Sequence, residues 1–161
     1  MALVSYPSEE IPGHPSVVLE LPEGWVVGTA PAVAFAAFSE KSGTTDFTPN
    51  CVVTIRRASS SISLEKVMAE SQQELVGLTD YAELTAVVTD IGQREVSVRE
   101  YAFTDDRSRT TVFQLQVTAL VPVDENTTDV VMLTVSHGPT GLDDSLAELR
   151  ELARSLRISR D

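Results

Sequence analysis

Strict alternation of apolar and polar residues between positions 113 and 121 is the feature that most restricts how this chain can fold. Phe113, Leu115, Val117, Ala119 and Val121 alternate with Gln114, Gln116 and Thr118. Successive side chains of a strand point to opposite faces, so this segment predicts a strand with one buried and one polar face. That pattern is typical of antiparallel sheets, since parallel strands are usually apolar on both faces.

Other segments show the same strand-like pattern, and two show helical spacing. We expect further strands at residues 17–21, 25–27, 32–39, 51–57, 84–88, 96–103 and 131–135. The apolar phase slips at Arg99 and Glu100, which predicts a β-bulge there. A helix is expected from about Leu64 to Val76 with Ser63 as its N-cap, because apolar residues recur three or four positions apart.

A second helix is expected to begin at residues 140–143, where the sequence Thr-Gly-Leu-Asp is close to a capping box. Its apolar stripe consists of Leu142, Leu146, Leu149, Ala153 and Leu156. The order of elements is therefore strands, a helix, four strands and a helix, with hairpin-length connections. This order predicts an α+β fold built on an antiparallel β-sheet flanked by helices.

The size of the chain indicates one domain. It has 161 residues, and domains cluster at about 100–150 residues. Turn-forming residues and two adjacent acids without periodicity open the sequence, so residues 1–16 are expected to form a partly ordered N-terminal arm. A single domain is expected over residues 17–161.

Charge narrows the class of partner. Twenty-four acidic residues against twelve Lys and Arg give a net charge of −12. This field repels phosphate backbones, which argues against nucleic acid, and it attracts a protein partner with a basic surface.

Features that address the cellular location are few. Pro7, Glu9 and Glu10 interrupt any apolar run near the start, which argues against a secretory signal. The longest uninterrupted apolar run, residues 32–38, is too short for a transmembrane segment. Cys51 is the single cysteine and has no intramolecular disulfide partner. We therefore expect a cytoplasmic protein.

One pair of residues has the spacing of a catalytic motif. Ser63 and Lys66 are placed as in the S-x-x-K motif of penicillin-recognising hydrolases, in which a lysine helps to activate a serine. The companion motifs S-D-N and K-T-G do not occur in the sequence. Helix capping by Ser63 is the favoured interpretation, and a serine hydrolase is kept as a remote alternative.

The remaining reactive side chains are isolated in the sequence. His14 and His137 lack metal-ligand spacing, and Cys51 at the start of a strand is expected to be buried and inert. Neither common glycine-rich phosphate-binding motif is present. The sequence therefore predicts no catalytic residue, no metal and no cofactor, and hence a protein that is not an enzyme.

Trp25 is the candidate partner-binding residue. It is the only tryptophan and follows a Leu-Pro-Glu-Gly corner, and exposed aromatic residues at such positions are enriched in recognition sites. The competing interpretation is that Trp25 packs against a sheet edge.

Several short motifs between residues 17 and 157 resemble LpqN/LpqT-type actinobacterial proteins. They are L-P-x-G-W at residues 21–25, F-x-P-N-x-V-V-T at 47–54, a serine-led helix at 63–65, Q-x-Q at 114–116, V-V-M-L-T at 130–134 and S-L-R at 155–157. The resemblance implies the PsbP-like fold, an α/β/α sandwich with an antiparallel sheet between helices. It also implies accessory or binding work instead of catalysis, because members are typically envelope lipoproteins and some relatives serve secretion systems.

These observations leave two main hypotheses. The first is a cytoplasmic, non-enzymatic accessory module that binds a protein, and its proposed link is to a secretion system or to cell-envelope machinery. The alternative is a small-ligand or lipid-binding protein that uses a pocket between the sheet and a helix. Exposed strand edges also leave a homodimer open.

Overall fold

A computed structural model describes residues 1–40 and 47–160 of the chain. The strands are β1 (Ser16–Val18), β2 (Trp25–Gly28), β3 (Phe35–Ser39), β4 (Asn50–Ser59), β5 (Ala82–Ile91), β6 (Arg94–Asp105), β7 (Thr110–Pro122), β8 (Thr127–His137) and β9 (Arg157–Ser159), and the helices are α1 (Leu64–Leu75) and α2 (Leu142–Arg154). Within the described residues, seven strands form an antiparallel sheet in the order β2-β3-β4-β8-β7-β6-β5, and β1 pairs with β9.

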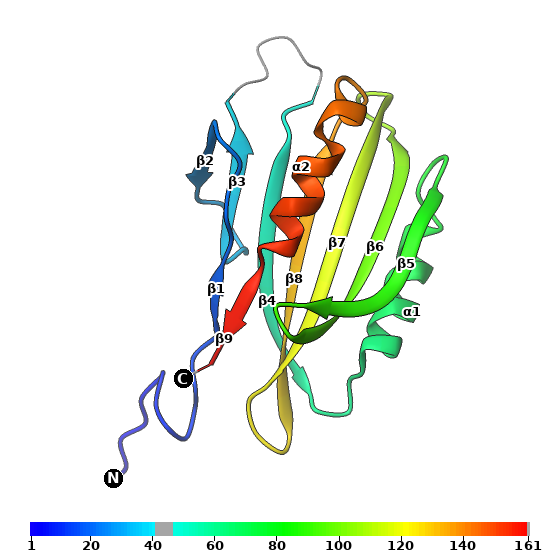
Figure 1. The fold of residues 1–161 in the computed structure, drawn as a ribbon. Helices are drawn as coiled ribbons and strands as arrows, with labels where there is room; N and C mark the ends of the chain where they lie inside the picture. The colour runs from blue at the N-terminus through cyan, green and yellow to red at the C-terminus, as the bar shows by residue number, and fades with distance from the viewer. Residues whose placement is uncertain (41–46, 161) are drawn as a thin grey trace.

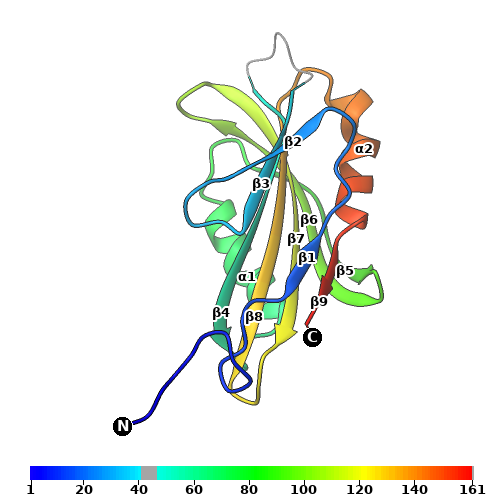
Figure 2. The ribbon, with the colours of Figure 1, turned by 90° about the vertical axis from the view of Figure 1, so that its left-hand side faces the viewer.

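The two helices lie on opposite faces of the seven-stranded sheet (Figures 1 and 2). Helix α1 packs against β6 and β7, and α2 packs against β7 and β8 on the other side. The prediction of an α+β fold with an antiparallel sheet flanked by helices is confirmed.

The face of the sheet beneath α2 carries the apolar core. Leu115 and Val117 of β7 and Leu133 of β8 are almost completely buried there. They belong to the same packed cluster as Leu149 and Leu152 of α2. The alternation predicted for residues 113–121 is thus correct, and its apolar side faces α2.

The opposite face, beneath α1, is held together by hydrogen bonds. The Tyr101 hydroxyl donates to Oε1 of Gln114, whose amide donates to Oγ of Ser136 at 3.0 Å. Arg99 donates to the backbone oxygen of Met68 in α1 at 2.9 Å. Burial raises the pKa of the Tyr101 phenol, so its hydroxyl stays protonated and can donate. Buried apolar side chains, among them Val67 of α1 and Val112 of β7, accompany these hydrogen bonds.

The predicted bulge at Arg99 and Glu100 was wrong. Pairing through β6 is continuous, and the irregularity lies in its neighbour β5, where Leu84 is skipped between Glu83 and Thr85. The apolar phase changes along β6 because the strand changes the face it uses: Val98 lies beneath α2, whereas Tyr101 lies beneath α1.

The start of α1 agrees with the prediction, whereas the start of α2 does not. Ser63 caps α1, and its Oγ accepts from the backbone N–H of Lys66 at 3.2 Å. Helix α2 begins differently: Gly141 is its N-cap in the left-handed region, with no side-chain cap bond. The predicted capping box is therefore absent, although Asp143 and Asp144 do occupy the first turn, where the helix dipole favours acids.

Two further predictions of local structure need correction. Residues 17–21 and 25–27 were expected as strands around one corner, but β1 pairs with β9 and β2 pairs with β3. Strand β9 itself was missed, because Arg157–Ser159 is too short to show a period.

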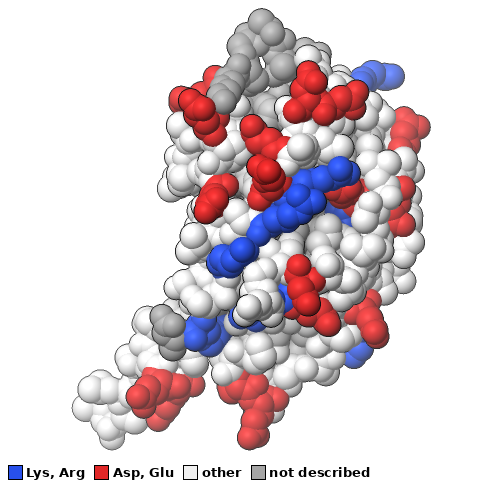
Figure 3. Space-filling view, in the orientation of Figure 1, with Lys and Arg blue, Asp and Glu red and all other residues white. Residues whose placement is uncertain are grey.

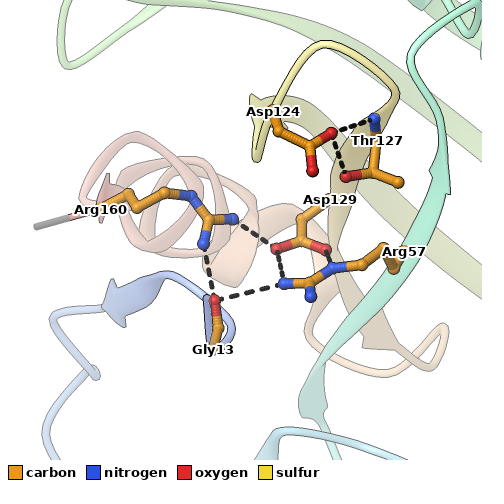
Figure 4. Close-up of polar contacts among 6 residues, drawn as sticks. All are labelled: Gly13, Arg57, Asp124, Thr127, Asp129 and Arg160. Atoms are coloured by element: carbon orange, nitrogen blue, oxygen red, sulfur yellow. Dashed lines mark hydrogen bonds and ion pairs between the residues drawn. The ribbon is translucent and has the colours of Figure 1, made fainter. Parts of the chain in front are cut away.

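One ion cluster closes the end of the α2 face (Figure 4). The fully buried carboxylate of Asp129 accepts from Arg57 at 2.9 and 3.1 Å and also from Arg160. Both guanidinium groups donate to the backbone oxygen of Gly13, Arg57 at 3.3 Å and Arg160 at 2.6 Å. Burial alone would raise the pKa of Asp129, but the hydrogen bonds from the two arginines outweigh it and hold the pKa below its usual value.

A candidate ligand-binding groove

A groove of about 410 Å³ runs between α2 and β5 on the apolar side of the sheet. Its residues are Thr85, Val87, Thr89, Asp90 and Ile91 of β5, Val98 and Glu100 of β6, Leu115 and Val117 of β7, and Arg150, Ala153 and Arg154 of α2. The volume lies within the range of small-molecule sites, about 300–1,000 Å³. Leu115 and Val117 are core residues, so the groove reaches from the surface down to the buried sheet.

The β5–β6 turn fixes the far wall of the groove. Gly92 and Gln93 both have positive φ values, of 57° and 66°, as the tight hairpin turn between these strands requires. A Cβ at Gly92 would lie 2.7 Å from Cδ of Arg157, so the turn sits directly on the C-terminal segment. Arg94 adds a hydrogen bond to the backbone oxygen of Ile158 at 3.3 Å.

An ion pair lies at one end of the groove. Arg150 of α2 donates to both carboxylate oxygens of Glu100, at 2.8 and 2.9 Å. The Glu100 side chain is 7% exposed and that of Arg150 is 40% exposed, so the pair bridges the buried floor and the rim. The hydrogen bond to Glu100 raises the pKa of Arg150, so the guanidinium remains charged.

Arg154 lies one turn beyond Arg150 at the rim of the groove, and its side-chain contacts differ from those of Arg150. Its guanidinium makes no hydrogen bond or ion pair with any residue that the structure describes. Seen from the α2 side, Lys and Arg side chains form a band across the molecule where α2 lies, with acidic side chains on both sides of it (Figure 3). The groove therefore combines an apolar floor, threonine hydroxyls and charged side chains of both signs, since Asp90 and Glu100 line it together with Arg150 and Arg154.

The S-x-x-K pair is not arranged for catalysis. Oγ of Ser63 accepts from the backbone of Lys66, whereas Nζ of Lys66 donates to the backbone oxygen of Ser61 at 3.0 Å. The lysine amine thus points to a carbonyl group instead of the serine hydroxyl. Ser63 acts here as a helix cap, as the favoured interpretation had it.

The other sequence candidates lie apart from the groove. Trp25 is half-buried and packs against the edge of the apolar core. His137 is buried, with Nδ1 2.7 Å from the backbone oxygen of Gly138. Cys51 is fully buried, and burial raises the pKa of its thiol to about 11, in agreement with the inert role expected for it.

No metal centre emerges from the geometry. Among residues 1–40 and 47–160, no three His, Cys, Asp or Glu side chains converge as a metal ion requires. Over the same residues, neither helix is long and apolar enough to cross a bilayer.

The sequence did not identify the groove residues. Segment 84–88 was predicted only as a strand, and nothing in its sequence indicated that Thr85 and Val87 face a groove. The groove exists because β5 and α2, far apart in sequence, meet over one face of the sheet. No periodicity within either segment carries that information.

Comparison with known proteins supplies the family. The family model described as probable lipoprotein LpqN matches residues 7–159. The chain belongs to the LpqN family. The resemblance inferred from the short motifs is thereby confirmed.

Solved structures support the fold of this LpqN-family protein. LpqN of Mycobacterium tuberculosis, described as involved in cell envelope biogenesis, matches with a TM-score of 0.76 and 14% identity over 92% of this chain and 86% of that one. The PsbP protein CyanoP of Synechocystis sp. PCC 6803 matches with a TM-score of 0.56 and 13% identity over 99% and 98% of the two chains. Comparison with curated proteins finds no match. At these identities the likeness establishes a PsbP-like fold.

The expected cytoplasmic location was wrong. The family is one of probable lipoproteins, which are associated with the cell envelope. The expectation was based on the interrupted start of the sequence, the lack of a long apolar run and the single cysteine, whereas the family match extends over nearly the whole chain.

Proposed function

We propose that this LpqN-family protein is a non-catalytic accessory protein of the cell envelope that binds an apolar or amphipathic small molecule in the α2–β5 groove. The observation that carries the proposal is the groove itself, with core residues Leu115 and Val117 as its floor. Sites for small molecules are typically concave and apolar with a few placed polar groups. Glu100, Arg150 and Arg154 supply those groups here.

Three observations support a binding role over a catalytic one. The Ser63–Lys66 pair is committed to capping α1 and to a backbone carbonyl. The groove's buried acid, Glu100, is neutralised by Arg150. The M. tuberculosis relative is described by envelope biogenesis and not by a reaction.

The test uses the neutral fluorescent probe N-phenyl-1-naphthylamine and two variants of one strand. Val87 and Val88 are both 46% exposed, but Val87 lines the groove and Val88 points to the opposite face. Val87→Trp fills the groove and is expected to weaken probe binding about tenfold, equal to about 1.4 kcal/mol. Val88→Trp adds the same ring outside the groove and is expected to leave the affinity unchanged.

Circular dichroism and thermal unfolding of both variants establish that each is folded. Equal binding by the wild type and the Val87→Trp variant would contradict the proposal. Loss of binding in both variants would also contradict it, because the effect would then not come from filling the groove.

A second candidate function is recognition of a protein with a basic surface. The net charge of −12 favours it. Trp25 remains the candidate contact, because it is only partly buried and belongs to β2 at the edge of the sheet. Cross-linking in native cells compares the wild type with Trp25→Phe, which keeps an aromatic ring in the core. We expect the wild type to capture a basic partner that the variant does not capture. An unchanged set of partners would count against the role of Trp25.

A further inference from the structure

The two edges of the seven-stranded sheet differ in how open they are to pairing. Strand β2 at one edge has four residues, and β5 at the other has ten. The outer edge of β5 pairs with no strand in the described part of the chain. An edge of this length exposes a row of backbone N–H and C=O groups to any second strand.

Strand β5 lacks the residues that usually protect a sheet edge. It contains no proline, lysine or arginine. Its irregularities are the skipped Leu84 near its start and a bend along the strand (Figure 1). Of its two acids, Glu83 is held by Arg99 and Asp90 lies near the far end. Leu84, Val87 and Val88 are exposed by 62%, 46% and 46%. A strand that is long, apolar and unprotected is expected to pair.

The central sequence of β5 is complementary to itself. Residues 85–89 read Thr-Ala-Val-Val-Thr. In an antiparallel pair of two copies centred on Val87, this valine faces its own copy, Ala86 faces Val88, and Thr85 faces Thr89. Pairs of β-branched residues and of threonines are among the stabilising cross-strand pairs.

Symmetry restricts the register of such a pair. The two-fold axis must pass between a residue and its own copy, because a pair centred between Ala86 and Val87 would oppose side chains that point to opposite faces of the sheet. Centring it on Val87 sets Asp90 opposite Leu84 and Glu83 opposite Ile91. The register with Val87 on the axis therefore avoids opposed charges.

We infer that two copies of the chain associate through β5, with Val87 on the two-fold axis and the sheets joined into one. A two-fold axis perpendicular to the sheet puts both α2 helices on the same side of the joined sheet. Thr85, Val87 and Thr89 line the groove in each copy, so the seam lies along the walls of both grooves. The dimer thus adds a second chain beside the candidate site.

Charge predicts how the dimer responds to salt. Each copy carries a net charge of −12, and this repulsion opposes association. Salt screens it without weakening backbone pairing or apolar contact. The dimer dissociation constant is therefore expected to fall as ionic strength rises, the reverse of an association held by ion pairs.

The experiment is sedimentation equilibrium of the purified chain and four variants over a range of concentrations and salt. Val87→Lys sets two lysines opposite each other on the axis and is expected to raise the dissociation constant at least about tenfold. Val87→Glu is expected to do the same. The control Val76→Lys changes a valine that is 57% exposed outside the sheet and should leave the constant unchanged, and Val88→Thr keeps a β-branched residue off the axis and should change it little.

Mixing the two charged variants tests the register. Lysine then faces glutamate on the axis, so the mixture is expected to form heterodimers with a dissociation constant within about threefold of the wild type. Circular dichroism establishes that each variant is folded. A wild-type chain that stays monomeric at every concentration and salt would overturn the inference, as would a dimer that survives Val87→Lys or a mixture that stays monomeric.

Discussion

Leu133 and Met132 are neighbours in β8 but lie on opposite faces of the sheet, in very different surroundings. Leu133 is completely buried in the apolar cluster beneath α2. Met132 lies on the α1 side, among Thr118, Thr134 and other polar residues, and is only half-buried. The α2 face is stabilised by area removed from water. The α1 face is stabilised by particular hydrogen bonds together with buried apolar residues such as Val112 and Val130.

This contrast explains where a ligand site can form. A groove of this kind needs an apolar floor that does not have to satisfy hydrogen bonds, and Leu115 and Val117 supply one on the α2 face. On the α1 face, Tyr101, Gln114 and Ser136 already hold one another, so an apolar ligand there would separate paired polar groups. The following experiments test this contrast between the two faces.

Truncation of the two neighbours in β8 should give the largest difference. Leu133→Ala is expected to lower the free energy of unfolding by about 4 kcal/mol, because a buried cavity remains. Met132→Ala, on the half-buried face, is expected to cost about 1 kcal/mol. Urea unfolding of both variants measures the two values. Equal losses would mean that the faces contribute alike.

Removal of the buried charge at the end of the α2 face should have the next largest effect. Asp129→Asn leaves Arg57 and Arg160 without their carboxylate and is expected to lower the unfolding free energy by about 3 kcal/mol. Chemical denaturation at neutral pH measures it. A cost near zero would show that the cluster is dispensable.

The stability lost in the Asp129→Asn variant should also depend on pH. The folded pKa of Asp129 is lowered, so its contribution is present above the unfolded value of about 3.9 and is lost as pH falls through the folded pKa. The stability difference between wild type and Asp129→Asn should therefore shrink in acid. Asp105 and Asp124, whose pKa values hydrogen bonds from Ser108 and Asn126 lower, act equally in both proteins and cancel in the difference.

The α1 side offers a smaller test. Ser63→Ala removes the cap of α1 and is expected to cost about 1 kcal/mol of stability. Ser63→Asp keeps a capping oxygen and should restore most of it. Thermal unfolding measures the stability of both variants. A serine-directed fluorophosphonate should not label Ser63 in the wild type, and it should not label the variants. Specific labelling of Ser63 would revive the hydrolase alternative.

The smallest expected signal comes from Cys51 on the α2 face. Its thiol is fully buried and its pKa is raised to about 11 by that burial, so little thiolate exists at neutral pH. A disulfide reagent such as Ellman's should react with the native protein only through unfolding. Reaction as fast as that of a free thiol would mean that the core near β4 opens readily.

The contrast between the faces also marks what the sequence could predict. The alternation in β7 and the stripe of α2 define the apolar face, because burial against one partner surface imposes a period on the residues themselves. The cap at Ser63 was also predictable, because the capping hydrogen bond joins residues only three positions apart in the sequence. Predictions failed where the cause lies across the sheet: the phase change at Arg99 and Glu100 reflects the two helices on opposite sides of β6.

The groove was beyond sequence reasoning for a further reason. Each of its walls is an ordinary segment: β5 looks like a weak strand, and Arg150 and Arg154 look like the favoured charges of a helix end. Only their meeting over Leu115 and Val117 forms the candidate groove. The short motifs identified the family without indicating which surface is used.

The shared carbonyl of Gly13 has a practical consequence for engineering. Arg57 and Arg160 both hold it over Asp129, so the two ends of the fold meet at one point. A short linker can join residues near 13 and 160, and new ends can be opened at the exposed turn around residues 106–108. Such a circularly permuted chain should keep both faces of the sheet intact, and it would move any attached anchor or label to the opposite pole of the molecule.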